Sequence, residues 1–170
     1  MDNDHYRLQR FVDAQNENGV YRRALSELRS GRKSGHWMWY VFPQLRGLGR
    51  SATSHEYGIS SLAEARAYLE HPVLGPRLLE CAQLLLSIDG ADADEIFGSI
   101  DAVKLRSCMT LFRRAAPENG AFQEVLDRYF EGSADRMTIS LLGGDDTGDT
   151  PSSSAGRGPA PDVDDDVVQG

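Results

Sequence analysis

Apolar residues recur at intervals of three and four positions along most of the chain, and alternating patterns are scarce. This spacing places apolar side chains on one face of a helix, whereas a half-buried strand requires alternation. The most regular stripe consists of Leu74, Leu78, Cys81, Ala82, Leu85 and Ile88. The sequence therefore predicts an all-α fold, a compact bundle of about seven or eight helices with one long loop.

Residues that favour helix ends divide this pattern. Gly31 and Gly90 follow apolar stripes, and a glycine commonly ends a helix. Ser61 and Glu64 have the spacing of a capping box, and Pro72 restricts the residue before it, so that helix should end near His71. Helices are also predicted over 8–15, 21–30, 92–97 and 101–116, from Pro117 to Gly132, and over 135–142.

The composition changes after residue 142. Residues 1–142 have the apolar content of a single helical domain, whereas 143–170 contain no aromatic residue and are rich in Gly, Ser, Pro and Asp. Such a segment cannot bury enough apolar surface to offset its loss of backbone entropy, so a disordered acidic tail is predicted. The tail accounts for −6 of the formal net charge of −8.

The remaining charge limits the classes of partner. A domain with a net charge of −2 lacks the basic surplus that duplex nucleic acid requires. Its basic segment, Arg22 to Lys33, is interpreted as a solvated helix face. Binding of nucleic acid is therefore a weaker hypothesis than binding of a small molecule or of another protein. Cys81 and Cys108 lack the spacing of a metal site, and neither a cofactor nor a metal is expected. With no signal peptide or membrane span evident, a cytoplasmic protein is expected. The oligomeric state stays open.

Aromatic residues concentrate in one stretch, HWMWYVFPQLRGLGRS, at residues 36–51. Trp37 and Trp39 are the two tryptophans of the chain. Stacked aromatic faces beside Lys33 can hold a flat ring such as a nucleobase. The same residues can instead fill the core where a loop crosses helices. Residues 36–60 are predicted to form a long loop, with a short strand or a turn at 39–42, and long loops are often functional.

Glycines follow the aromatic residues. Gly47 and Gly49 let successive backbone N–H groups point at one anion, and Arg46 and Ser51 supply further donors. The segment matches neither a P-loop nor a dinucleotide-binding fingerprint, so a phosphate cradle and a plain loop are both compatible with it.

Polar residues also line one side of the helix predicted at 101–116. Asp101 and Lys104 are three positions apart, and Ser107 continues the row; they can form a simple surface pair or face the aromatic loop. His36 is the nearest group that titrates near neutral pH. The predicted catalytic residues are His36, Asp101 and Lys104, and the predicted ligand-binding residues are Lys33, Trp37, Trp39, Gln44, Arg46, Gly47, Gly49, Ser51, Tyr57 and Ser107.

The string GRKSGHWMWYVFPQLRGLGRS, together with Tyr57-Gly58-Ile59, His71-Pro72 and Met109-Thr110-Leu111-Phe112, resembles a bacterial family catalogued as domain of unknown function 1810. Members have sometimes been labelled calpastatin. The family is similar in architecture to the mostly helical YbiA-like, or NADAR, group, which acts on N-glycosidic bonds of ribosylated metabolites. The resemblance implies a YbiA-like bundle.

The wider resemblance also implies a function. It suggests that the domain binds or hydrolyses a ribosylated nucleotide or an ADP-ribose-like metabolite, a small-molecule partner. However, Gln9 and Asn16 stand where that group has a glutamate and a lysine. Proton transfer contributes about 10²- to 10⁴-fold to rate, so hydrolysis would need Lys33, His36 or Lys104 as a substitute. The alternative hypothesis is a non-enzymatic protein-interaction module.

Overall fold

The computed structural model describes residues 4–143, and the regular structure in this range is helical apart from one isolated bridge. The elements are α1 (Gln9–Asn16), the 3-10 helix η1 (Glu17–Gly19), α2 (Val20–Ser30), α3 (Met38–Val41), α4 (Ala52–Glu56), α5 (Leu62–Glu70), α6 (Leu74–Ser87), α7 (Ala93–Ala115), α8 (Ala121–Phe130) and α9 (Arg136–Leu141). The predicted compact all-α bundle is confirmed. The predicted tail, apart from Gly143, lies outside the described residues.

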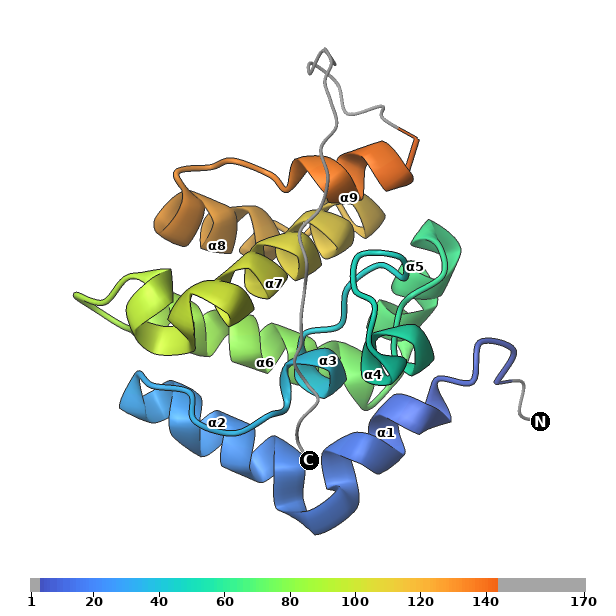
Figure 1. Ribbon diagram of the computed structural model, residues 1–170, viewed down its shortest axis with the longest axis horizontal. Coiled ribbons are helices and arrows are strands. Elements are labelled where there is room, and N and C mark those ends of the chain that lie inside the picture. The colour runs from blue at the N-terminus through green and yellow to red at the C-terminus, as the bar shows by residue number, and fades with distance from the viewer. Residues whose placement is uncertain (1–3, 144–170) are drawn as a thin grey trace.

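Helix α7 lies in the middle of the bundle (Figure 1). It packs against α8, α5 and α9 and also contacts α3. Helix α6 packs against α8, α5 and α2 on the other side of the core. The apolar stripe predicted on α7, Leu105, Cys108, Met109 and Phe112, is completely buried. The 3.6-residue period of the sequence therefore identified the face on which the domain is built.

Helix α5 begins and ends where the sequence predicted, whereas α6 ends at Ser87, three residues before the predicted end at Gly90. The hydroxyl of Ser61 accepts a hydrogen bond from the N–H of Glu64 at 3.1 Å, which caps α5. The chain then reverses at His71 and Pro72, and Nδ1 of His71 accepts from the N–H of Val73 at 3.1 Å. A Cβ on Gly75 would lie 2.0 Å from the carbonyl oxygen of Leu69, so a glycine is required where the two helices meet.

A glycine also interrupts α7. Gly98 has φ 83° and ψ 158°, a conformation that is essentially restricted to glycine. The helix therefore consists of a short first part, capped by a capping box between Asp92 and Glu95, and a long second part. The sequence predicted this division and the cap at Asp92, although the helical path continues across the break.

Two local predictions differ from the structure. Pro117 was expected to open a helix, but α8 begins at Ala121, and Pro117 lies in the turn before it. Of the strand and the turn predicted at 39–42, the structure has a turn, the single helical turn α3, and α4 adds a second short helix to the predicted loop. Both short helices depend on tertiary contacts, because helices of four or five residues are not stable alone.

None of the described helices is long and apolar enough to cross a membrane. Within residues 4–143, the acidic, histidine and cysteine side chains also form no group of three or more that could hold a metal ion.

Candidate functional site

A single carboxylate, that of Glu27 on α2, fixes the segment between α2 and α3. It accepts hydrogen bonds from the backbone N–H of Ser34 at 2.8 Å, the N–H of Gly35 at 2.9 Å and the indole N–H of Trp37 at 2.8 Å. Burial alone would raise the pKa of Glu27, but these hydrogen bonds outweigh it and hold the pKa below its ordinary value. The segment is therefore held in one conformation.

This segment positions Lys33 against α7. The backbone N–H of Lys33 donates to the carbonyl oxygen of Ile96 at 2.7 Å. Its side chain is only 6% exposed, and Nζ lies 2.7 Å from Oδ2 of Asp101. The same ammonium group donates to the carbonyl oxygen of Gly35 and lies 5.0 Å from the ring centroid of Trp37. Lys33 is thus an almost buried cation with a carboxylate, a carbonyl and an aromatic face around it.

Asp101 is shared by two lysines. Nζ of Lys104 lies 3.2 Å from Oδ1 of Asp101, and both side chains are partly exposed. The cluster of Lys33, Asp101 and Lys104 therefore sets two ammonium groups against one carboxylate. Of the residues predicted from sequence, the structure brings together these three and Trp37.

Both tryptophans belong mainly to the core. Trp37 is 2% exposed and Trp39 is 7% exposed. The ring of Trp37 packs 6.2 Å from that of Phe42, and a Cβ on Gly49 would lie 3.2 Å from Trp39. A flat ligand would reach either ring only if the loop moved, so their burial favours the core-filling alternative.

The glycine-rich segment has its own local partners. Gly47 adopts φ 104°, and a Cβ on Gly49 would lie 2.8 Å from the Cβ of Ser54. The hydroxyl of Ser51 caps α4 by accepting from the N–H of Ser54 at 3.0 Å. Arg46 donates to the carbonyl oxygen of Gly58 at 3.2 Å. These contacts explain the glycines by packing, and the phosphate cradle stays a prediction.

The other predicted site residues have varied surroundings. His36 is exposed, and Ser107 donates to the carbonyl oxygen of Val103 at 3.2 Å. Tyr57 packs edge-on against Tyr40 at 4.9 Å, and burial raises its pKa. Gln44 is buried, and its Nε2 has no hydrogen-bond partner. The contacts of Tyr57 are thus with another aromatic group rather than with the lysine cluster.

The sequence did not reveal two of the polar groups that organise this region. Glu27 resembles any polar residue on the outer face of α2. Arg10 and Glu64 form a buried ion pair at 3.2 Å, although they are far apart in the chain. Arg10 also donates to the carbonyl oxygens of Glu56 at 2.8 Å and Gly58 at 3.1 Å, which ties α1 to the end of the loop. No local pattern indicates either set of partners.

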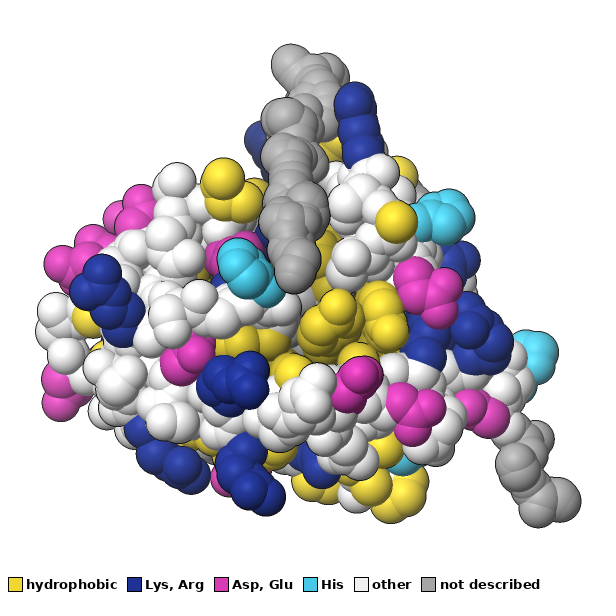
Figure 2. Space-filling model, turned by 60° about the horizontal axis from the view of Figure 1, so that its bottom comes forward, with side chains coloured by type: hydrophobic (Ala, Val, Ile, Leu, Met, Phe, Trp, Pro, Cys, Tyr) yellow, Lys and Arg dark blue, Asp and Glu magenta, His cyan; other side chains and the backbone are white. Residues whose placement is uncertain are grey.

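The face in Figure 2 has an apolar centre with acidic and basic side chains interspersed around it. A nucleic-acid backbone favours a continuous stripe of basic residues. The basic residues visible on this face do not form one.

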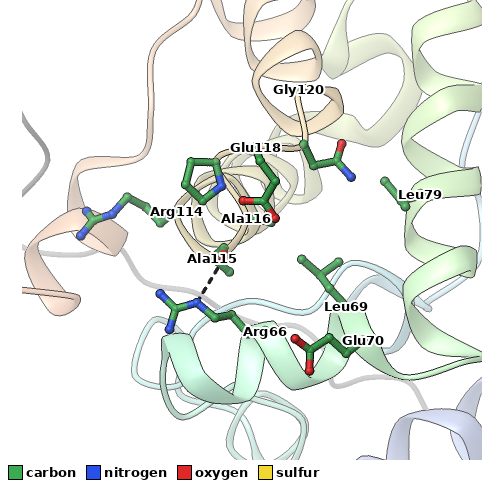
Figure 3. A pocket seen from close by; sticks show the side chains of 11 residues that line it. Arg66, Leu69, Glu70, Leu79, Arg114, Ala115, Ala116, Glu118 and Gly120 are labelled. Carbon is green, nitrogen blue, oxygen red and sulfur yellow. Dashed lines mark hydrogen bonds between the residues drawn. The ribbon is translucent and has the colours of Figure 1, made fainter.

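A separate pocket of about 750 Å³ lies between α5, α6 and the turn from α7 to α8 (Figure 3). Leu69 and Leu79 contribute apolar walls, and Glu70 and Glu118 contribute carboxylates. Arg66 donates to the carbonyl oxygen of Ala115 at 3.2 Å across its edge. None of the residues predicted from sequence lines this pocket.

Comparison with known proteins identifies the family of this chain. The model of the family described as "Protein of unknown function (DUF1810)" matches residues 5–142. The chain belongs to the DUF1810 family. That match spans the cluster of Lys33, Asp101 and Lys104 and almost all the residues that the structure describes.

A crystal structure of the conserved hypothetical protein Rv1873 from Mycobacterium tuberculosis is similar to this DUF1810 domain. The two sequences are 56% identical, the TM-score is 0.77, and the match covers 79% of this chain and 95% of that chain. No curated protein matches the chain. The family resemblance predicted from sequence is confirmed, whereas these matches show neither the YbiA-like resemblance nor the calpastatin label.

Proposed function

We propose that the domain binds a small phosphate-bearing metabolite, of the ribosylated-nucleotide or ADP-ribose type, at the cluster of Lys33, Asp101 and Lys104. One observation carries the proposal: the nearly buried ammonium group of Lys33 shares its carboxylate with Lys104. A buried ion pair is weak evidence for stability, because desolvation offsets much of its attraction. The second lysine leaves a positive surplus beside a fixed, partly buried charge, which suits an anionic ligand.

The solvent exposure of the cluster supports this assignment. Lys33 is the buried member, whereas Lys104 and Asp101 reach the surface in part. An arriving phosphate can therefore contact Lys104 while Asp101 and the ring of Trp37 hold Lys33 in place. Hydrogen bonds to charged groups contribute about 1.5–3 kcal/mol each, so a contact with Lys104, beside the positive charge of Lys33, favours an anionic ligand.

The geometry supports binding better than hydrolysis. A general base must lie within hydrogen-bond reach of the water that it deprotonates. Both oxygens of Asp101 already bind ammonium groups, Oδ2 that of Lys33 and Oδ1 that of Lys104, so an attacking water would compete with these cations for the remaining lone pairs. Hydrolysis of an N-glycosidic bond would be favoured by release of Asp101 or by His36 acting in its place.

Isothermal titration of the full chain with ADP-ribose tests the proposal. We expect K104A to weaken binding by about tenfold or more, since it removes a charged contact. R29A is the matched control because it removes the same charge from an exposed position on α2, and it should change the affinity by less than about twofold. Absence of binding by the wild-type protein at millimolar ADP-ribose, or equal effects of the two variants, would reject the proposal.

A second function, protein interaction, is favoured by one specific observation. Ile100 and Val103 on α7 are 60% and 59% exposed, although both are large apolar residues. They lie three positions apart and so share one side of the helix, beside Lys104. If a second copy of the chain covers them, light scattering should show a mass that rises with concentration, and I100D should abolish that rise. A constant monomer mass would argue against self-association through this face.

A further inference from the structure

The pocket between α5, α6 and the turn after α7 is separate from the lysine cluster, because none of Lys33, Asp101 and Lys104 lines it. Its volume of about 750 Å³ lies within the range of about 300–1,000 Å³ that small-molecule sites occupy. The proposed function therefore leaves a cavity of ligand size unexplained.

Contacts within the fold hold the walls of this pocket in place. Arg66 ties α5 to the end of α7 through its hydrogen bond to the carbonyl oxygen of Ala115 at 3.2 Å. In the turn, the N–H of Asn119 donates to the carbonyl oxygen of Ala116 at 2.9 Å, and its Oδ1 accepts from the N–H of Ala121 at 3.1 Å. The cavity is therefore already formed in the free protein, as is usual for ligand sites.

The lining combines an apolar surface with two carboxylates. Leu69 on α5 and Leu79 on α6 are half-buried and pack against the core. Glu70 and Glu118 are exposed, and neither forms an ion pair with another of the residues 4–143. A ligand in this pocket would therefore meet both hydrocarbon and negative charge that the fold has not neutralised.

Two arginines also line the pocket, but their charged groups are directed elsewhere. Figure 3 shows the guanidinium groups of Arg66 and Arg114 pointing away from the leucines and from Glu70. The hydrogen bond from Arg66 to Ala115 keeps its guanidinium at the edge of the cavity. The arginines thus leave both carboxylates available to a cationic ligand.

We infer that this pocket binds an aliphatic amine, whose ammonium group is attracted by Glu70 and Glu118 and whose hydrocarbon chain packs against Leu69 and Leu79. An ammonium group is a compact cation with three N–H donors, so it can hydrogen-bond carboxylate oxygens from more than one element. Burial of the chain adds a hydrophobic contribution that grows with each methylene. The inference is independent of the proposed function, since the two sites share no residue.

A nuclear magnetic resonance titration of the full chain with pentylamine at neutral pH tests the inference. The readout is the backbone amide signals of Ala116 and Gly120, which line the pocket. We expect these signals to shift to saturation with a dissociation constant of about 10 mM or less. Pentanoate has a similar chain with the opposite charge, and methylammonium has the charge without the chain. Each should bind at least about tenfold more weakly than pentylamine.

Substitutions test the role of the carboxylates. The double variant E70Q/E118Q removes both charges and preserves the size of both side chains, so pentylamine binding should weaken by about tenfold. E17Q/E131Q is the matched control, because it removes two charges from exposed positions outside the pocket and should change the affinity by less than about twofold. The urea midpoints of both variants check that the fold is retained.

Each outcome supports or overturns the inference. Absence of shifts in the pocket amides at about 10 mM pentylamine would overturn it. Equal weakening in the two double variants would overturn it as well, because the amine would then respond only to the overall acidity of the chain. Pentanoate binding as tight as that of pentylamine would assign the pocket to anions through its arginines. Failure of ADP-ribose to bind would reject the proposed function and leave this inference standing.

Discussion

Among the described residues, the ion pair of Arg10 with Glu64 and the cluster of Lys33, Asp101 and Lys104 both attach loop segments to helices, but they differ in how completely their charges are matched. Arg10 and Glu64 form a one-to-one pair, and both side chains are almost fully buried. Around that pair, Arg10 donates to four backbone carbonyls, and Glu64 accepts from the N–H and hydroxyl of Ser60, both at 2.8 Å. The cluster of Lys33, Asp101 and Lys104 instead has two cations for one anion and reaches the surface.

This difference separates a structural group from a candidate binding group. A charge pair with every donor and acceptor engaged holds two segments together and offers nothing to a ligand. In a cluster with two cations and one anion, the protein neutralises only part of the positive charge. A phosphate can supply the negative charge that is missing. The two clusters should therefore respond differently to substitution.

We expect the largest loss of stability when the ion pair of Arg10 and Glu64 is broken. E64Q leaves the guanidinium of Arg10 buried without a carboxylate, and breaking a buried pair in this way costs about 3–5 kcal/mol of unfolding free energy. Urea denaturation of the full chain measures it. E70Q, at an exposed position on the same helix, should change stability by less than about 0.5 kcal/mol. A cost for E64Q as small as that of E70Q would remove the distinction between the clusters.

A smaller loss of stability is expected from D101N. It leaves the buried ammonium of Lys33 without its carboxylate, but Lys33 keeps the carbonyl of Gly35 and the ring of Trp37. We expect a loss of about 1–3 kcal/mol by urea denaturation. D94N is the comparison, since Asp94 is an exposed acidic residue near the start of α7. If D101N destabilised the fold no more than D94N does, Lys33 would not depend on Asp101.

Of the three substitutions E64Q, D101N and K104A, we expect K104A to affect stability least. Partly exposed ion pairs at this spacing contribute about 0.2–0.5 kcal/mol, so the unfolding free energy should fall by less than about 1 kcal/mol. The same variant is expected to lose most of its affinity for ADP-ribose. A large loss of stability together with unchanged binding would make this cluster structural, like that of Arg10 and Glu64.

The smallest expected effect is a local dependence on pH, in the segment that Glu27 fixes. Because hydrogen bonds hold the folded pKa of Glu27 below its ordinary value, its contribution to stability is present above the unfolded pKa and is lost as pH falls through the folded pKa. The indole N–H signal of Trp37 in a nuclear magnetic resonance titration should therefore shift below about pH 4.5. E27Q should remove this titration, and persistence of the same shift in E27Q would assign it to another group.

Much of the fold follows from short-range patterns. The stripe of α6, the cap at Ser61 and the helix end at Gly31 each depend on residues within a few positions, and the structure has all three. The capping box at Ser61 is only half formed, because the carboxylate of Glu64 turns to Ser60 and Arg10. The neighbouring Ser60 and the distant Arg10 thus replaced the bond to Ser61 that the spacing predicted.

The candidate site was less accessible to sequence reasoning. Lys33, Asp101 and Lys104 were each identified, but a separation of 68 positions gave no sign that Lys33 and Asp101 touch. Glu27 was missed because its partners lie in an irregular segment seven to ten positions later. For Trp37 the sequence left a ligand-binding face and core filling both open, and its burial and its hydrogen bond to Glu27 favour core filling.

The bridge between Leu45 and Ile59 closes the glycine-rich loop at its base, and a Cβ on Gly58 would lie 2.7 Å from the Cα of Arg46. The two ends of the loop are therefore anchored to each other before the chain continues into α5. Loop closure costs only about 0.6 kcal/mol for each doubling of loop length. Residues inserted at the exposed Arg50 would therefore lengthen this loop at little cost in unfolding free energy. That position offers protein engineers a place to insert a tag or a reporter domain while the helical bundle is left undisturbed.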